Sequence, residues 1–187
     1  MMKLLDMPKK LSINEPYSPA EDTFFFAEHL KDESGEKALD VGTGSGYLAK
    51  LLSSNFKLII ATDLDFNSLK HTHKSIENCI CCNGASPILE KFDLIVCNLP
   101  YLPSDSIQDI TVDGGKEGII IPINIINTVK NLLKTTGKFL FLTSSHANYK
   151  NLIDHTKSLG FTVKIIGKKK LFFEELILVE ARKKQTY

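Results

Sequence analysis

Short apolar runs of strand length alternate with helix-length stretches along most of the chain, and this alternation constrains the fold more than any other feature. Seven runs have the length and pattern of strands: Lys37–Val41, Lys57–Thr62, Cys79–Cys82, Phe92–Cys97, Lys138–Thr143, Thr162–Ile166 and Leu171–Glu180. Helices are expected near Ala20–Lys31, Tyr47–Ser54, Phe66–Asn78, Pro122–Lys134 and Ala147–Leu159. The alternation predicts an α/β fold in which helices cover both faces of a parallel sheet.

The end of the chain departs from this alternation. Only Gly167–Lys170 separates the last two strand candidates, which leaves no room for a crossover helix, so an antiparallel hairpin is expected. No repeat, proline-rich linker or low-complexity segment divides the sequence. We therefore expect residues 1–187 to form one domain.

One connection is unusually long. Leu102–Gly118 is rich in glycine, proline and aspartate and has no clear periodicity. Connections of this length inside compact domains are usually functional or disordered.

A glycine-rich segment, Asp40–Gly46, follows the first predicted strand and opens a helix. Glycine there lets the backbone turn sharply and pass close to a ligand, which also suits NAD, FAD or a plain tight turn. Here the spacing is Gly-x-Gly-x-Gly and Asp40 stands directly before it. S-adenosyl-L-methionine has no pyrophosphate but carries an ammonium group that a carboxylate can bind. We therefore predict that Asp40, Gly42 and Gly44 bind this cofactor.

Two further polar residues follow strand candidates. Asp63 ends the second strand, where a carboxylate can accept hydrogen bonds from both hydroxyls of a ribose. A helix cap or a turn aspartate is the alternative, but Asp65 is better placed for capping. Asn83 follows the third strand and could bind the adenine amino edge, although Asn-Gly is also a common turn sequence.

The segment Asn98–Tyr101, with the sequence Asn-Leu-Pro-Tyr, directly follows the fourth predicted strand. An amide or exocyclic amine nitrogen is a poor nucleophile, because its lone pair is conjugated. Carbonyl oxygens of the Asn98 side chain and the Leu99 main chain can accept its two N–H groups and support the charge that develops on nitrogen. Pro100 stiffens the turn, and Tyr101 can stack on a planar substrate group. An ordinary turn is the alternative, but the position after a glycine loop and a ribose acid favours this catalytic clamp.

These motifs resemble the HemK-type class I methyltransferases, whose substrate motif is Asn-Pro-Pro-Tyr, and specifically the short archaeal and eukaryotic branch that modifies class I release factors. Tyr17–Phe24 (Tyr-Ser-Pro-Ala-Glu-Asp-Thr-Phe) is similar to the Pro-Ala-Glu-Asp-Thr signature of that branch. Asp113–Gly118 resembles the glycine-rich segment that follows the clamp. The resemblance extends over nearly the whole chain, from about Tyr17 onward.

The resemblance implies a Rossmann-like, class I methyltransferase fold with a seven-stranded, mostly parallel sheet and an antiparallel last strand. It implies that Thr23 and Gly42 contact the cofactor, and we expect Asn98 to contact it as well. The reaction it implies is N5-methylation of the glutamine in a Gly-Gly-Gln motif of a release factor.

Three departures from the family pattern stand out. Leu99 replaces the first proline of the clamp, which preserves the backbone carbonyl but loosens the turn. Asn83 stands where relatives often have an acid. The longer bacterial enzymes carry an N-terminal helical domain for the factor, and this chain has no room for one.

The third strand candidate, Cys79–Cys82, should lie at a sheet edge, because that is its place in the class I strand order. It contains no lysine or proline that would discourage pairing with another chain. We therefore hypothesise that a partner adds a strand to this edge or covers it; the alternative is a short strand covered by its own loops. The family resemblance implies a small zinc-ribbon activator protein in this place.

Two other functions remain open. The same clamp can hold the amino group of adenine, so an adenine-N6 methyltransferase acting on DNA or RNA is the alternative enzyme. The formal net charge of +1 and the lack of a target-recognition domain disfavour a free-standing nucleic-acid enzyme. A non-catalytic protein that binds S-adenosylmethionine is the third reading, which the presence of Asn98 and Tyr101 disfavours.

The remaining composition predicts no metal site and no membrane segment. The four cysteines, Cys79, Cys81, Cys82 and Cys97, are expected to be reduced thiols, because the sequence has no second cysteine cluster that could complete a metal site or disulfides with the first three. Met1–Lys10 lacks the apolar stretch of a secretory signal. The longest aliphatic run, Ile119–Ile126, is interrupted and too short to span a bilayer. We expect a cytoplasmic protein.

Overall fold

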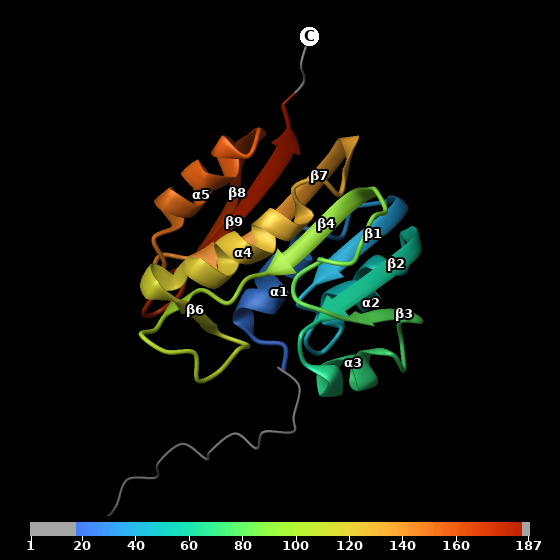
Figure 1. Ribbon diagram of the computed structural model, residues 1–187, viewed down its shortest axis with the longest axis horizontal. Coiled ribbons are helices and arrows are strands. Elements are labelled where there is room, and N and C mark those ends of the chain that lie inside the picture. Colours follow the sequence, from blue (N-terminus) through green and yellow to red (C-terminus); the bar gives the residue numbers. More distant parts are fainter. Residues whose placement is uncertain (1–17, 185–187) are drawn as a thin grey trace, which may run out of the picture.

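A seven-stranded sheet forms the centre of the protein. The computed structural model describes residues 18–184; Tyr17 of the signature segment and Met1–Lys10 lie outside that range. The strand order is β3-β2-β1-β4-β7-β9-β8 (Figure 1). The strands are β1 (Gly35–Val41), β2 (Phe56–Asp63), β3 (Asn78–Cys81), β4 (Phe92–Asn98), β7 (Leu133–Ser144), β8 (Phe161–Lys170) and β9 (Glu175–Lys183).

The sheet is parallel except at one end. β3, β2, β1, β4 and β7 pair in parallel, whereas β9 is antiparallel to both β7 and β8. This arrangement confirms the predicted, mostly parallel sheet with an antiparallel hairpin at the end of the chain. β3 lies at the edge of the sheet, as expected.

Helices cover both faces of the sheet. They are α1 (Glu21–Glu28), α2 (Tyr47–Leu52), α3 (Phe66–Thr72), α4 (Ile120–Val129) and α5 (Tyr149–Ser158). Figure 1 shows α4 and α5 in front of the sheet and α1 behind it. Side chains of β4 alternate between two apolar cores, because Ile95 and Cys97 pack on the α4–α5 side while Leu94 and Val96 pack on the α1–α2 side.

The structure corrects three predicted boundaries. Gly167–Lys170 does not form the turn between the last strands but continues β8, where Lys168 pairs with Ile177 and Lys170 with Glu175; the turn is Leu171–Glu174. The helix predicted for Phe66–Asn78 ends at Thr72, because Asn78 already pairs with β2.

The helix predicted for Pro122–Lys134 instead begins at Ile120 and ends at Val129, since Leu133 pairs with Phe92 in the sheet. In these cases strand pairing decided a boundary that local pattern left open.

The long connection Leu102–Gly118 contains local structure. Two short strands, β5 (Leu102–Pro103) and β6 (Asp113–Gly115), pair with each other, and a single 3₁₀ turn, η1 (Lys116–Gly118), leads to α4. The segment is therefore tied down at both ends, and its middle residues extend over the carboxyl edge of the sheet.

No helix within residues 18–184 is long and apolar enough to cross a membrane. The same residues contain no group of three or more histidine, cysteine, aspartate or glutamate side chains arranged to hold a metal ion.

We predict that Leu178→Ala lowers the free energy of unfolding by about 2–5 kcal/mol, because Leu178 of β9 is completely buried and its removal leaves a cavity. The same substitution at Leu89, which is 91% exposed, should change it by less than about 0.5 kcal/mol. Urea denaturation of both variants measures the difference, and equal losses would contradict the described core.

Candidate active site

The main pocket opens where the chain reverses its direction across the sheet. From β1 the chain runs outward through β2 to β3, and then returns to place β4 on the other side of β1. Ligands bind at such a switch point in open α/β sheets, outside the carboxyl ends of the strands. A cavity of about 320 Å³ lies there, large enough for a small-molecule ligand. Asp40 pairs with Val96, so the segments that follow β1 and β4 leave the sheet side by side.

The glycine loop after β1 is held by Asp40. The Thr43 hydroxyl and the Ala49 main-chain N–H both donate to Asp40 Oδ2, at 2.7 and 3.1 Å. This carboxylate therefore fastens the loop to the first turn of α2. Burial raises the pKa of Asp40 to about 6, even though these two hydrogen bonds favour the ionised form.

Gly42 shows why the loop needs glycine. Its φ of +69° is unfavourable for other residues, and nothing lies within 4 Å of the position that a Cβ would take. A side chain there would therefore enter the open space of the pocket. The main chain at Gly42 is left bare toward the cavity, as a close-binding ligand requires.

Asp63 lies at the end of β2, beside the glycine loop. Its two carboxylate oxygens accept the main-chain N–H groups of Gly44 and Asp65, both at 2.8 Å. Burial raises the pKa of Asp63. Asp65, in contrast, caps α3 by accepting N–H groups of Asn67 and Ser68. The capping role that was the alternative for Asp63 thus belongs to Asp65.

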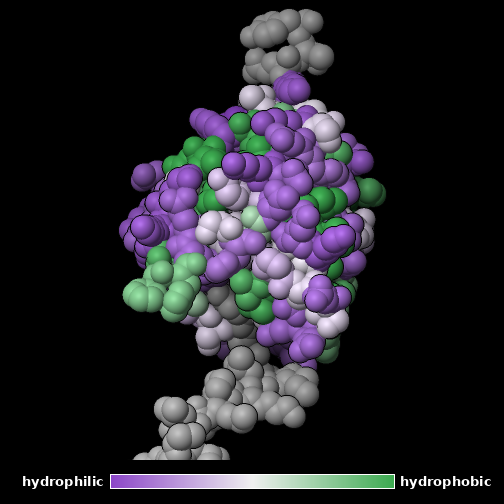
Figure 2. All heavy atoms as spheres, turned by 90° about the vertical axis from the view of Figure 1, so that its left-hand side faces the viewer, coloured by the Kyte–Doolittle hydropathy of each residue, from purple (hydrophilic) through white to green (hydrophobic). Residues whose placement is uncertain are grey.

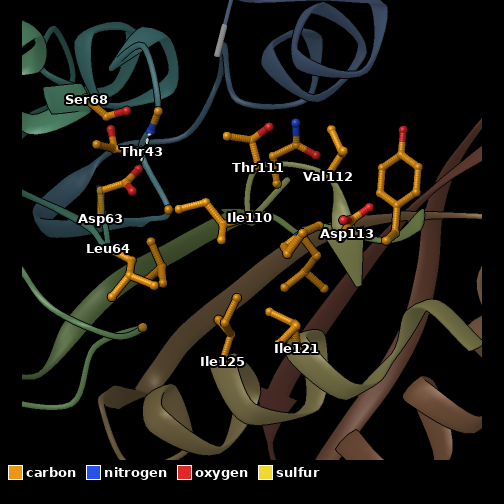
Figure 3. Close-up of a pocket in the computed structure, with 18 of the residues that line it drawn as sticks. Thr43, Asp63, Leu64, Ser68, Ile110, Thr111, Val112, Asp113, Ile121 and Ile125 are labelled. Atoms are coloured by element: carbon orange, nitrogen blue, oxygen red, sulfur yellow. Dashed lines mark hydrogen bonds between the residues drawn. The ribbon is translucent and has the colours of Figure 1, made fainter. Parts of the chain in front are cut away.

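The pocket has a polar end and an apolar side. Figure 3 shows Thr43, Asp63 and Ser68 gathered at one end, with the Asp63 carboxylate bonded to the loop. Leu64, Ile121 and Ile125 form an apolar boundary nearby, and Thr23 and Asn83 also line the cavity. Residues 110–113 of the long connection lie at the other end (Figure 3). An elongated ligand with an apolar ring and a hydroxylated part fits this division.

The Asn98 side chain at the end of β4 has a defined orientation. Its Nδ2 donates to Asp22 Oδ2 at 3.0 Å, and Asp22 belongs to the first turn of α1. The amide oxygen, Oδ1, is fully buried and accepts no hydrogen bond from the described residues. Since a buried acceptor without a donor is unfavourable, this oxygen is suited to accept an N–H group from a ligand.

The backbone of the clamp packs against two glycines of the long connection. A Cβ on Gly114 would lie 2.7 Å from the Pro100 carbonyl oxygen, and one on Gly118 would lie 2.2 Å from that of Tyr101. Gly118 also has a φ of +68°. These glycines therefore allow the long connection to lie directly on the Asn98–Tyr101 segment and hold it in place.

The structure brings all ten predicted site residues to one pocket: Thr23, Asp40, Gly42, Gly44, Asp63, Asn83, Asn98, Leu99, Pro100 and Tyr101. Sequence reasoning missed the Asp22–Asn98 hydrogen bond, because the two residues are 76 positions apart. It also missed the apolar boundary, which α4 supplies, and Glu174 of the final hairpin. Only the position of Asp22 beside Thr23 in the signature segment could have indicated its role.

The four cysteines are free thiols and are not grouped as metal ligands in the described part of the chain. Cys79, Cys81 and Cys82 lie on or beside the edge strand, and Cys97 is buried in β4. Burial raises the pKa of the Cys97 thiol well above its usual range, so it remains neutral. None of them takes part in the clamp.

We predict that Asp40 makes the protein less stable as the pH rises. The Asp40 carboxyl has a pKa of about 6 in the folded protein, compared with an ordinary value of 3.8. The stability that it contributes is therefore fully present below pH 3.8 and is lost as the pH rises through about 6. The total loss should be on the order of 3 kcal/mol. Asp40→Asn keeps an acceptor for Thr43 and Ala49 but cannot ionise. Urea denaturation from about pH 4 to about pH 7 should show that the free energy of unfolding of the variant increases relative to that of the wild type as the pH rises. A difference that stays constant with pH would contradict the raised pKa.

Methyltransferases are similar to this chain in sequence and in fold. A putative protein N5-glutamine methyltransferase of Methanocaldococcus jannaschii is 32% identical over 180 residues, which cover 89% of this chain and 91% of that protein. The Mtq2–Trm112 complex of E. cuniculi, described as responsible for methylating the translation termination factor eRF1, contains a chain with a TM-score of 0.77 at 23% identity. The match covers 90% of this chain and 98% of that one.

A further structure shares the fold. The N-methyltransferase NodS of Bradyrhizobium japonicum, solved with S-adenosyl-L-homocysteine, matches with a TM-score of 0.65 at 14% identity, over 88% of this chain and 86% of that one. The family model of the methyltransferase small domain matches residues 20–172, which include the glycine loop, Asp63 and the clamp. The chain therefore belongs to the methyltransferase small domain family.

Proposed function

We propose that this protein transfers a methyl group from S-adenosyl-L-methionine to the side-chain amide nitrogen of a glutamine, in the Gly-Gly-Gln motif of a class I peptide chain release factor. The observation that carries the proposal is the Asn98 amide oxygen, which is buried, oriented by Asp22 and without a donor among residues 18–184. The names of the M. jannaschii and E. cuniculi relatives support the same substrate chemistry. Because release factors act on ribosomes, the proposal places the protein in the cytoplasm.

The residues around the glycine loop fit the cofactor. Gly42 leaves the main chain open to the pocket, and Gly44 lines the cavity while its N–H binds Asp63. Asp63 is placed to accept hydrogen bonds from ribose hydroxyls, and Asn83 is placed near the apolar boundary for the adenine. Thr23 lines the pocket next to Asp22, which binds Asn98, and Asp40 supports the loop through Thr43 and Ala49. When bound, S-adenosyl-L-methionine supplies an electrophilic methyl group on a sulfonium.

The clamp residues position the nucleophile. Asn98 Oδ1 and the Leu99 main-chain oxygen accept the two N–H groups of the amide, which orients the nitrogen and stabilises the positive charge that develops on it. Asp22 acts as a positioning residue, because its bond to Nδ2 turns Oδ1 toward the substrate. Tyr101 stacks on the planar group, and Pro100 stiffens the turn.

We further propose that a second protein, a small zinc-ribbon activator, binds the edge strand β3. On the outer side of β3 no strand of the described chain pairs with it, and its residues are only half-buried or exposed. An unprotected edge favours addition of a strand from another chain. The E. cuniculi relative was solved as a complex with Trm112. A soluble, fully active monomer at high concentration would contradict this part of the proposal.

Parallel incubations test the substrate. The protein and labelled S-adenosyl-L-methionine are mixed with a release factor, a duplex oligonucleotide or ribosomal RNA, and fragment mass spectrometry locates the methyl group. We expect label on the glutamine of the release factor. Label on adenine but never on glutamine would replace the proposal by the adenine-N6 alternative.

We predict that Asn98→Ala lowers kcat at least about 100-fold, because it removes an acceptor for the charge that develops in the reaction. The dissociation constant of the cofactor, measured by calorimetry, should remain nearly unchanged. The same substitution at Asn124, which is exposed on α4, serves as the control and should leave both values intact. A collapse of cofactor affinity in Asn98→Ala would contradict the role assigned to this side chain.

We predict that Asp63→Ala, in contrast, mainly weakens binding of the cofactor. Loss of the ribose acceptor should raise the cofactor dissociation constant by about 10-fold or more, in line with the loss of hydrogen bonds to a charged group. Asp65→Ala, two residues away, removes the α3 cap and should lower stability by about 1 kcal/mol while leaving cofactor affinity close to the wild-type value. Unchanged affinity in Asp63→Ala would remove this residue from the site.

A further inference from the structure

The turn between β8 and β9 lies at the same edge of the sheet as the clamp. β9 is antiparallel to β7 and begins opposite its end, with Leu176 paired to Ser144. The residues before it, Leu171–Glu174, therefore extend beyond the carboxyl ends of the parallel strands; the turn is at the left of Figure 1. In strand order, β9 lies on the opposite side of β4 from β1 and β2. The turn thus reaches the pocket from the side away from the glycine loop.

The turn is fixed rigidly to the end of β7. Ser145 donates its main-chain N–H to the Glu175 carbonyl, and its hydroxyl accepts the N–H of Glu175, both at 2.9 Å. The Leu171 N–H closes the turn on the Glu174 carbonyl at 2.7 Å, and the Leu171 side chain packs against the apolar core. These contacts determine where the Glu174 side chain lies.

The two sides of the turn have different character. Phe172 and Phe173 are 92% and 82% exposed and pack edge to face on each other. Figure 2 looks onto this side of the molecule and shows a pale hydrophobic protrusion on a largely hydrophilic surface. Glu174 instead lines the pocket, and its Oε2 is fully buried with no hydrogen-bond donor among the described residues.

A buried carboxylate oxygen without a donor is unfavourable, so it is suited to a ligand that brings one. Most residues that we assign to the cofactor follow β1, β2 or β3, whereas Glu174 belongs to the hairpin on the opposite side of β4, which the proposed function makes the substrate side. The two N–H groups of the target amide are already assigned to Asn98 and Leu99. The donor for Glu174 must therefore come from the part of the substrate that flanks the target group.

We propose that Glu174 accepts a hydrogen bond from a main-chain N–H of the substrate polypeptide and thereby selects a peptide over a nucleic acid. A peptide has an N–H group at nearly every residue, whereas a nucleic acid flanks its bases with phosphates, which bring no N–H donor to the buried oxygen of Glu174. The exposed Phe172 and Phe173 provide an apolar surface for the same substrate just outside the pocket. This inference rests on the proposed function and assigns a specificity role within it.

The test compares Glu174→Ala with Glu175→Ala. Glu175 is the adjacent residue but forms an ion pair with Lys168 on the surface, so it controls for loss of charge in the hairpin. In Glu174→Ala we expect the KM for the release factor to rise about 10- to 100-fold, with kcat within about threefold of the wild type. Calorimetric titration of the release factor into protein saturated with S-adenosyl-L-homocysteine should show the same loss of affinity.

Two further readouts exclude a structural effect. The melting temperature and the affinity for S-adenosyl-L-homocysteine should be unchanged in Glu174→Ala, and Glu174→Gln, which retains an acceptor oxygen, should recover most of the release-factor affinity. Unchanged KM and affinity in Glu174→Ala, or equal losses in Glu175→Ala, would overturn the inference. If the wild-type protein does not methylate the release factor at all, the proposed function fails, independently of Glu174.

Discussion

The parallel pairing of β1 with β4 is the constraint on which the rest of the structure depends. It brings together two segments that are more than fifty residues apart, the glycine loop that begins after Val41 and the clamp that begins at Asn98. Because the chain leaves β1 toward β2 and returns to β4, the carboxyl ends of β1 and β4 border the opening in which the pocket lies. The other contributions, from α1, the long connection and the final hairpin, are arranged around this opening.

Two buried oxygen atoms, Asn98 Oδ1 and Glu174 Oε2, accept no hydrogen bond from the described residues and mark the side of the pocket that we assign to the substrate. Each is positioned by another element: Asp22 of α1 binds the Asn98 side chain, and Ser145 fixes the turn that carries Glu174. Such oxygens favour a substrate rich in N–H groups. The acceptors that lack a donor in the described residues therefore indicate which groups a bound substrate supplies.

Much of this could be predicted from the sequence, since the motifs directly follow apolar strands and therefore meet at one edge of the sheet. The glycine loop, Asp63 and Asn98 were placed in this way. Contacts between distant segments could not be predicted, and the Asp22–Asn98 bond is an example. Glu174 was missed for a local reason: Gly167–Lys170 has the composition of a turn, but pairing with β9 extends the strand and moves the turn to the pocket.

Gly114 and Gly118 have a consequence for how this protein can diverge. They contact the clamp through backbone atoms, so replacing either one disturbs the carbonyl groups of Pro100 and Tyr101. Ile107 and Ile110, between β5 and β6, instead line the cavity with their side chains. Substitutions at these two positions therefore alter the lining of the cavity, whereas substitutions at the two glycines alter the clamp itself.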